Sequence, residues 1–336
     1  MSVTIREVAR QANVSTATVS RVLNGSGPVA ESTRLRVTQA VVDLAYEPNA
    51  VARSLVSSAT HTIGILLPDI SNPFFPELVK GVQLLADDRR YTLLLLNTEA
   101  SAIREASALS TLRGKRVDGV VMVGLTTRPE QIKEVLGTEI PVVVLDRAMR
   151  PGSFTVVRLD HGRGAAMAMT HLVELGHRRI AHVAGPRGLE LSRQRTGGYR
   201  AALRRLGEPA DPRLLLRGDF SELGGSVAVE QLLDAGLDFT AIFAANDLSA
   251  IGAIRALQTH GLRVPDDVSV IGFDDIQLAG YVTPALTTIR QPTYAMGRRA
   301  AELLIDAVEG TGSLTPRTVL FEPELVVRES TAPPAR

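Results

Sequence analysis

The sequence predicts an α/β protein in which a small helical domain at the N-terminus precedes a larger core of doubly wound parallel β-sheets. Residues 4–45 carry helical periodicity alone, whereas short apolar runs alternate with helical segments from residue 61 onward. At 336 residues the chain is also longer than one ordinary domain. We therefore expect at least two domains of different architecture.

Two short helices joined by a tight turn are expected within residues 4–24. Thr4 and Glu7 can form a capping box at the start of the first helix. Asn13 suits the left-handed conformation of the turn, and Ser15 is a suitable N-cap for the second helix. The inward-facing apolar positions are Val8, Ala9, Ala12, Val19, Val22 and Leu23.

The outward face of the second helix carries short hydrogen-bonding groups around one long forked donor. Its residues are Thr16, Ala17, Thr18, Ser20, Arg21 and Asn24. The major groove of DNA suits such a surface, and Arg21 alone is long enough for a bidentate contact to guanine. Ser15 and Thr18 are expected to bind phosphates, which fix register without reading sequence. The alternative is an ordinary helical hairpin with a solvated polar face.

A third amphipathic helix is expected at residues 31–45, although Ala30 is a weak helix cap. Val37, Ala40, Val41 and Leu44 form its apolar face. Further evidence comes from an ordered set of motifs in and after these helices. They are Val14-Ser15, Thr18-Val19-Ser20-Arg21-Val22 and Asn24, followed by Tyr46, Pro48, Asn49, Ala52 and Leu55. In this order they resemble the lactose/galactose/purine-repressor family of bacterial transcription regulators, and the resemblance extends through nearly the whole chain.

That resemblance implies a DNA-binding transcription regulator, usually a repressor, which binds a palindromic operator as a homodimer and responds to a small molecule. Residues 1–46 would form a helix-turn-helix headpiece, and residues 47–60 a hinge helix with its linker. The hinge helix, at about residues 49–56, should form only when docked in the minor groove, with Leu55 as a wedge between base pairs. The expected DNA contacts are Thr4, Ile5, Ser15, Thr16, Ala17, Thr18, Ser20, Arg21, Asn24, Tyr46, Asn49, Ala52 and Leu55.

Nine apolar runs predict the strands of the core: residues 63–68, 92–96, 119–123, 141–145, 155–159, 180–184, 214–216, 241–244 and 269–273. Most are apolar on both faces, which is typical of parallel strands covered by helices on both sides. Segments between them, such as residues 74–89, 162–176 and 248–260, carry helical periodicity. Two doubly wound units of this kind exceed one sheet. The resemblance implies two similar lobes joined by three crossovers, like periplasmic sugar-binding proteins.

On this basis residues 61–330 form the core for effector binding and dimerisation. The N-lobe would hold about residues 61–160 and 291–320, with a helix at 290–310, and the C-lobe about residues 161–290 and 321–330. Residues 331–336 are expected to be a flexible tail. The expected dimer surface includes the helix around residues 74–85. Tetrameric relatives add a leucine-heptad tail, and because none follows here we expect a dimer.

Polar residues follow several predicted strands, at the position where open α/β sheets bind ligands. The candidate contacts are Phe74, Asp146, Arg147, Asp160, Arg195, Phe220, Asn246, Asp274 and Gln291. Carboxylates, amides and arginine forks suit polyols, and Phe74 and Phe220 could face the apolar side of a sugar ring. By resemblance, Arg195 aligns with a ligand-holding arginine and Asp274 with its carboxylate partner, and Asn246 and Asp146 align with other contact positions.

Some of these residues have a second interpretation. An Asp at a strand end is often the N-cap of the next helix, so Asp69, Asp160, Asp219 and Asp247 remain open between cap and ligand contact. Phe75 is expected in the core. Leu189 and Leu191 stand where purine-binding relatives carry polar residues, so we expect a sugar or sugar derivative instead of a purine.

Composition limits the remaining function classes. The chain has no cysteine, which excludes disulfides and thiol chemistry, and its net charge is only +1. Its histidines, His61, His161, His171, His177, His182 and His260, show no metal-ligand spacing. Without a nucleophile elbow or a dinucleotide fingerprint, we expect no catalytic residues, no metal and no cofactor. The alternative function is a flavodoxin-like or sugar-metabolising enzyme. No signal run or membrane-length segment is present, so we expect a cytoplasmic, nucleoid-associated protein without a membrane partner.

Overall fold

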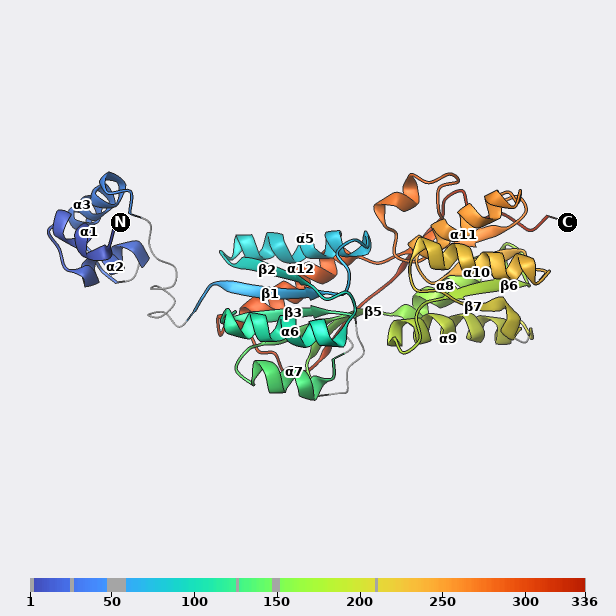
Figure 1. Cartoon of the computed structure of the whole chain (residues 1–336), viewed down its shortest axis with the longest axis horizontal. Coiled ribbons are helices and arrows are strands. Elements are labelled where there is room, and N and C mark those ends of the chain that lie inside the picture. The colour runs from blue at the N-terminus through green and yellow to red at the C-terminus, as the bar shows by residue number, and fades with distance from the viewer. Residues whose placement is uncertain are drawn as a thin grey trace. The chain divides into compact units, whose positions relative to one another are not determined.

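The computed structural model describes residues 3–24, 27–46, 59–124, 127–146, 152–208 and 211–335. The chain divides into two compact units, Met1–Thr60 and His61–Arg336 (Figure 1). The hinge segment predicted at residues 49–56 lies outside the described residues.

Three short helices around one small core make up the first unit. They are α1 (Ile5–Gln11), α2 (Thr16–Asn24) and α3 (Glu31–Asp43). The buried centre consists of Val8, Ala9, Ala12, Val19, Val37 and Ala40, which are positions predicted from the helical spacing. The Glu7 carboxylate accepts the amide and the hydroxyl of Thr4 at 2.7 and 2.9 Å. Asn13 turns the chain with a φ of 52°, and Ser15 Oγ accepts the amide of Thr18 at 3.1 Å.

Helix α3 ends at Asp43, so the prediction that it reaches residue 45 was wrong. Ala45 adopts a φ of 45°, and its amide donates to the carbonyl of Val42. The amide of Tyr46 donates to the carbonyl of Val41, which completes a Schellman motif. Glycine usually occupies the left-handed position of that motif, and an alanine there gives no signal in the sequence.

The N-lobe of the second unit is a six-stranded parallel sheet in the order β11-β5-β4-β3-β1-β2. Its strands are β1 (Thr62–Leu67), β2 (Thr92–Asn97), β3 (Gly119–Val123), β4 (Val142–Leu145), β5 (Thr155–Leu159) and β11 (Thr318–Phe321). Its helices are α5 (Phe74–Asp88), α6 (Ala102–Gly114), α7 (Pro129–Leu136) and α12 (Thr293–Val308). Helices α5 and α12 pack together on one face, and α6 and α7 cover the other (Figure 1).

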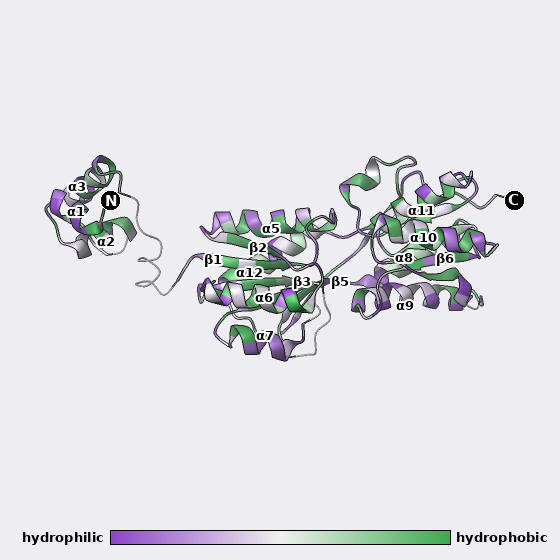
Figure 2. Cartoon of the chain, viewed as in Figure 1, coloured by the Kyte–Doolittle hydropathy of each residue, from purple (hydrophilic) through white to green (hydrophobic). Residues whose placement is uncertain are grey.

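Strand β1 alternates its side chains between these two layers. Ile63 and Ile65 belong to the cluster that includes α5 and α12, whereas Leu66 packs with α6 and α7. Helices α5 and α12 approach closely at Gly81, where an added Cβ would lie 2.2 Å from the carbonyl oxygen of Tyr294. Hydrophobic colour is concentrated along the strands and the inner faces of the helices (Figure 2).

The C-lobe has a four-stranded parallel sheet in the order β7-β6-β8-β9. Its strands are β6 (Ile180–Ala184), β7 (Leu215–Arg217), β8 (Ala241–Ala244) and β9 (Ser269–Ile271), with β10 (Thr288–Arg290) and β12 (Glu324–Val326) as an antiparallel pair. Its helices are α8 (His161–Glu174), α9 (Glu190–Arg205), α10 (Glu222–Asp234) and α11 (Asp247–Thr259), with the short helices η1 (Pro212–Leu214) and η2 (Gln277–Gly280). Helix α8 pairs with α9, and α10 with α11.

The chain passes between the two sheets three times, from β5 to α8, from β10 to α12 and from β11 to β12. The predicted fold class, a helical headpiece and a two-lobed doubly wound parallel core, is therefore confirmed. Among the described residues, no helix is both long and apolar enough to cross a membrane.

The end of the chain differs from the flexible tail predicted from residue 331. The hydroxyl of Thr331 lies 2.9 Å from Nε2 of His171, and the carbonyl of Ala332 lies 2.9 Å from Nε2 of His177. The amide of Ala332 donates to Ser269 Oγ at 3.0 Å. Short polar and small residues resemble a tail in sequence, but here their polar groups have partners on the C-lobe.

Candidate functional site

A cavity of about 1090 Å³ lies at the carboxyl ends of strands from both lobes, a volume that suits a small-molecule ligand. Seven of the nine predicted ligand residues line it: Phe74, Asp146, Arg195, Phe220, Asn246, Asp274 and Gln291. Arg147 lies outside the described residues. The doubly wound arrangement explains this convergence, because parallel strands deliver all their following loops to one edge of the sheet.

Asp160 is the predicted residue that the structure does not bring to the cavity. It is the N-cap of α8, and its carboxylate accepts the amide of Arg163 at 3.0 Å. Asp160 therefore serves as a helix cap, and it is not among the residues that line the cavity. Asp247 is also absent from the lining, because its carboxylate accepts the Thr288 hydroxyl at 2.5 Å and the Ile276 amide at 2.9 Å.

Asp69 and Asp219 do line the cavity, and neither is a helix N-cap. Each forms a turn with the serine two residues later. The Asp69 carboxylate accepts the amide and hydroxyl of Ser71 at 2.9 and 2.7 Å, and Asp219 accepts those of Ser221 at 2.9 and 2.5 Å. The same Asp-x-Ser turn thus follows β1 in one lobe and β7 in the other.

Five of the non-glycine lining residues have a backbone conformation that side chains rarely adopt, and three of these are predicted ligand contacts. Asp146, Phe220 and Asp274 have φ values of 54°, 70° and 128°. A bulky residue such as Phe220 is an outlier at positive φ, and strain of this kind tends to persist at functional sites.

Arg195 on α9 is fully surrounded, with 3% of its surface exposed. Nη1 donates to the carbonyl of Ala245 at 2.5 Å, and Nη2 lies 3.6 Å from Oδ1 of Asp274. Its guanidinium carbon lies 3.8 Å from the ring centroid of Phe273, a cation–π distance. These contacts fix a planar fork at the cavity, with its Nε atom buried and without a hydrogen-bond partner among the described residues.

His161 is a site residue that the sequence analysis missed. It begins α8 directly after Asp160 and is 3% exposed. Nδ1 lies 3.2 Å from Nη2 of Arg195, and Nε2 lies 2.6 Å from Oδ1 of Asp146. Because the guanidinium can only donate, Nδ1 accepts, and Nε2–H donates to Asp146. His161 therefore links Asp146 of the N-lobe to Arg195 of the C-lobe. Its position one residue beyond a strand-end Asp was the only available signal.

The two carboxylates beside this network have opposite pKa shifts. Burial raises the pKa of Asp274 well above its usual value, against the attraction of Arg195. Burial acts in the same direction on Asp146, but His161 and Arg195 outweigh it and hold the pKa of Asp146 below its usual value. The cavity therefore offers one ionised acceptor and one carboxyl group that can donate or accept, which suits hydroxyl groups.

Amides complete the polar lining. Gln291 donates from Nε2 to Asp274 at 2.6 Å, while its Oε1 has no partner among the described residues. Asn246 caps α11 by accepting the amide of Ser249 at 3.1 Å, and its Nδ2 donates to the carbonyl of Phe220 at 2.9 Å. Of the amide atoms of Asn246 and Gln291, Oε1 of Gln291 is thus the one most available to a ligand. Among the described residues, no cluster of acidic and histidine side chains has a metal-binding arrangement.

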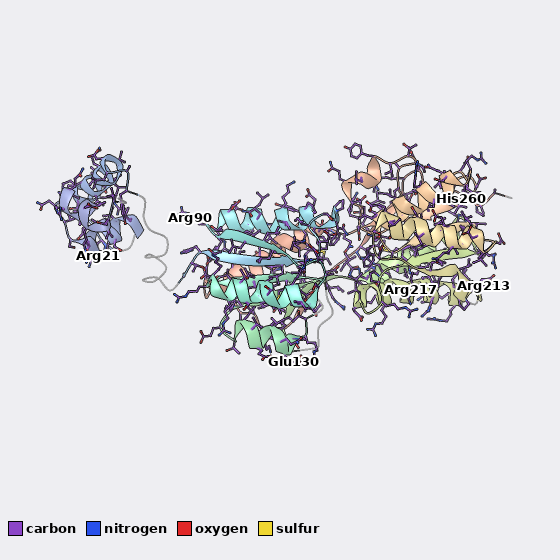
Figure 3. All side chains as sticks on the ribbon, viewed as in Figure 1. Arg21, Arg90, Glu130, Arg213, Arg217 and His260 are labelled. Atoms are coloured by element: carbon purple, nitrogen blue, oxygen red, sulfur yellow. The ribbon has the colours of Figure 1, made fainter. Side chains whose placement is uncertain are left out.

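The predicted DNA-reading face lies on α2. Thr16, Ala17 and Arg21 are exposed, and Arg21 projects at the surface of the headpiece (Figure 3). Ser15 and Thr4 are also exposed at helix starts, and Thr18 and Ser20 are half-buried. Ile5 and Tyr46 pack against the headpiece core. The side chain of Asn24 and the residues Asn49, Ala52 and Leu55 lie outside the described part of the chain.

Comparisons with known proteins agree with this architecture. Residues 4–49 match the lacI family of bacterial regulatory proteins, and residues 169–331 match the periplasmic binding protein-like domain. The chain is 40% identical over 307 residues to the ribose operon repressor of Escherichia coli (strain K12), covering 91% of this chain and 93% of that protein.

Two solved structures extend the likeness to three dimensions. The lac repressor dimer bound to operator and the anti-inducer ONPF has a TM-score of 0.89 and 30% identity, covering 99% of this chain and all (100%) of that chain. A LacI family transcriptional regulator from Enterococcus faecium with bound ribose has a TM-score of 0.73 and 33% identity, covering 81% of this chain and 99% of that chain.

Proposed function

This chain belongs to the lacI family of bacterial regulatory proteins, and we propose that it is a repressor that binds a palindromic operator as a homodimer under the control of a sugar. One observation carries the proposal: a single chain holds both an exposed helix-turn-helix surface and a polar cavity at the strand ends of two lobes. The family consists of DNA-binding regulators, and we place this protein in the cytoplasm at the nucleoid, without catalytic activity.

On the DNA side, α2 is the recognition helix. Its exposed Thr16, Ala17 and Arg21 face base edges in the major groove, and Arg21 supplies the bidentate contact to guanine. Ser15 and Thr18 hold phosphates, although Ser15 Oγ also accepts the amide of Thr18 in the free protein. The hinge segment with Asn49, Ala52 and Leu55 would enter the minor groove, as proposed from the family resemblance.

On the effector side, a hydroxyl-rich ring explains the lining best. Arg195, Asp146, Asp274 and Gln291 offer both donors and acceptors, and the carboxylates have complementary protonation tendencies. Phe74 and Phe220 provide apolar surface for the flat side of a ring. Because the similar regulator from Enterococcus faecium holds ribose, pentoses are the first sugars to test.

The test is a selection of operator DNA from a random palindromic library, followed by titration of the selected site with and without ribose, glucose and cellobiose. We expect a specific site with two half-sites about one helical turn apart, and one sugar that shifts operator affinity. Loss of affinity on adding sugar marks an inducer, and a gain marks a corepressor. Failure to enrich any sequence would reject the DNA-binding proposal.

A further inference from the structure

A second pocket lies within the C-lobe, where the first turns of α9 meet the end of β7. Its volume is about 330 Å³, at the lower end of the range for small-molecule sites. Four arginines line it, Arg187, Arg193, Arg200 and Arg217, and none of its lining residues is acidic. The proposed repressor function assigns no role to Arg193, Arg200 or Arg217, and of the four only Arg187 also lines the ligand cavity.

Most of this positive charge has no counter-charge. Arg193 forms an ion pair with Glu190. Within the described part of the chain, Arg187, Arg200 and Arg217 make no ion pair within 4.0 Å. The positive potential reaches the lobe interior: burial is the main cause that lowers the pKa of His182 to about 4, and Arg217 and Arg200 lower it further.

Two further features of α9 favour an anion at the same place. The N-cap of this 16-residue helix is Leu189, which has no side-chain oxygen to accept the first amides, and the acidic residue of its first turn, Glu190, is paired with Arg193. Ser192, which lines the pocket, is 3% exposed, and its Oγ has no hydrogen-bond partner among the described residues. A buried hydroxyl without a partner is uncommon, and a ligand would satisfy it.

We propose that this pocket binds a phosphoryl group, with Arg187, Arg200 and Arg217 as its charge partners and Ser192 Oγ as a hydrogen-bond donor. Guanidinium forks match phosphate oxygens in geometry and remain charged at every physiological pH. The small volume fits inorganic phosphate or the phosphate end of a small ester.

The site shares a wall with the ligand cavity. Pro186, Arg187, Gly188 and Leu189 line both the pocket and the cavity. A phosphoryl group that fixes this segment on one side therefore changes the surface offered to the effector on the other. By linkage, the effector must change phosphate affinity by the same factor.

The experiment is calorimetric titration of the full chain with inorganic phosphate and, separately, with ribose 5-phosphate, at constant ionic strength. The test variant carries Arg200→Gln and Arg217→Gln together. Both side chains are exposed, so the variant should keep the fold, and a thermal melt checks this. The control is Arg213→Gln, which removes a positive charge four residues before Arg217 (Figure 3). Arg213 does not line the pocket, and its Nη2 donates to Asp211 at 2.8 Å.

We expect the double variant to bind at least about tenfold more weakly and the control to stay within about twofold of the original chain. Binding of both probes identifies the free anion as sufficient, whereas binding of the ester alone that the double variant weakens identifies an ester site in this pocket. Lack of binding of either probe at about 10 mM, or equal binding by the double variant, overturns the proposal. Neither result bears on operator binding, so failure here leaves the proposed repressor function intact.

Discussion

Several neighbouring residues fix the position of the Arg195 side chain at the cavity. Ala245 and His161 hold the two ends of the guanidinium fork, and Phe273 covers one face. His161 in turn holds Asp146 of the other lobe. Removing one member of a buried charged network typically costs about 3–5 kcal/mol, because the remaining charge loses its partner.

Arg21 tests sequence reading. Arg21→Ala should weaken specific operator binding by about 1–3 kcal/mol and relax the preference at one base pair in each half-site. The reason is that, among the described side chains of α2, no other exposed one is long enough to reach two acceptors of guanine. A half-site selection with the variant measures this. An unchanged preference at every position would remove Arg21 from the base-reading role.

Asp247 tests the electrostatics of the C-lobe interior. Burial raises its pKa to about 6 from an ordinary value of 3.8. An acid whose pKa is higher in the folded state binds its proton more tightly there, so its contribution to stability is lost as the pH rises from about 4 to about 6. Asp247→Asn should therefore gain in unfolding free energy relative to the original chain over this interval, by about 1–3 kcal/mol.

Urea unfolding of both proteins at intervals between pH 4 and pH 7 gives this difference directly. Carboxylates that are not influenced by Asp247 titrate equally in both proteins, so their contributions cancel. A difference that stays constant with pH would show that Asp247 ionises normally. Because Asp274 also has a raised pKa and is influenced by Asp247, part of the pH dependence should remain in the variant.

The sequence predicts which loops form the cavity better than it predicts which side chain of each loop faces it. Asp146, Asp274 and Asn246 reach the cavity because the end of a parallel strand fixes their place. Asp160 ends a strand too, yet its carboxylate turns back to the amide of Arg163, and the next residue, His161, turns inward. A difference of one residue around a helix start decides the outcome, and spacing alone cannot resolve it.

At the level of elements, pairs of glycines allow helices to pack closely in each lobe. An added Cβ at Gly81 or Gly297 would lie about 2 Å from backbone of the facing helix, 2.2 Å from Tyr294 and 2.1 Å from Leu78 respectively. In the C-lobe, Gly225 and Gly252 meet α11 and α10 in the same way. The lobes thus use one packing device twice, as they use one Asp-x-Ser turn twice.

Gly81→Ala should lower the free energy of unfolding by about 1–3 kcal/mol, because α5 and α12 must separate to accommodate the methyl group. The control is Gly114→Ala at the end of α6, where an added Cβ meets nothing within 4 Å. That change should be neutral or stabilise by up to about 1 kcal/mol. Urea denaturation compares them, and equal midpoints would contradict the close-contact argument.

Strands that are buried along their whole length are predictable from the sequence, and strands β10 and β11 are not. Strands β1, β3 and β8 are continuous apolar runs buried on both faces, and their observed limits agree with the predicted ones to within a residue. Strand β10 is only Thr288-Ile-Arg290, and β11 is only four residues at the sheet edge. Partners distant in the sequence make them strands, and no local pattern contains that information.

At the scale of the whole molecule, the effector must favour one arrangement of the lobes. Arg195→Ala and Asp274→Ala should abolish the response to the sugar while leaving sugar-free operator affinity nearly unchanged, if the sugar is an inducer. In the original chain the sugar should change operator affinity roughly 5–150-fold, equivalent to about 1–3 kcal/mol of coupling.

Operator titrations with and without the sugar check both variants, and retained sugar-free affinity shows at once that each variant is folded. For a corepressor, both variants would fail to bind operator tightly at any sugar concentration. A normal sugar response in both variants would place the effector site elsewhere in the chain.

The three passages of the chain between β5 and α8, β10 and α12, and β11 and β12 mean that neither lobe is a continuous piece of sequence. No single truncation can produce one lobe alone, since the N-lobe sheet needs β11 from near the end of the chain. A protease that cuts one passage still leaves the two lobes joined by the other two passages. Limited proteolysis at one passage should therefore yield two fragments that separate only under denaturing conditions. The same two fragments could be made as separate polypeptides that reassemble.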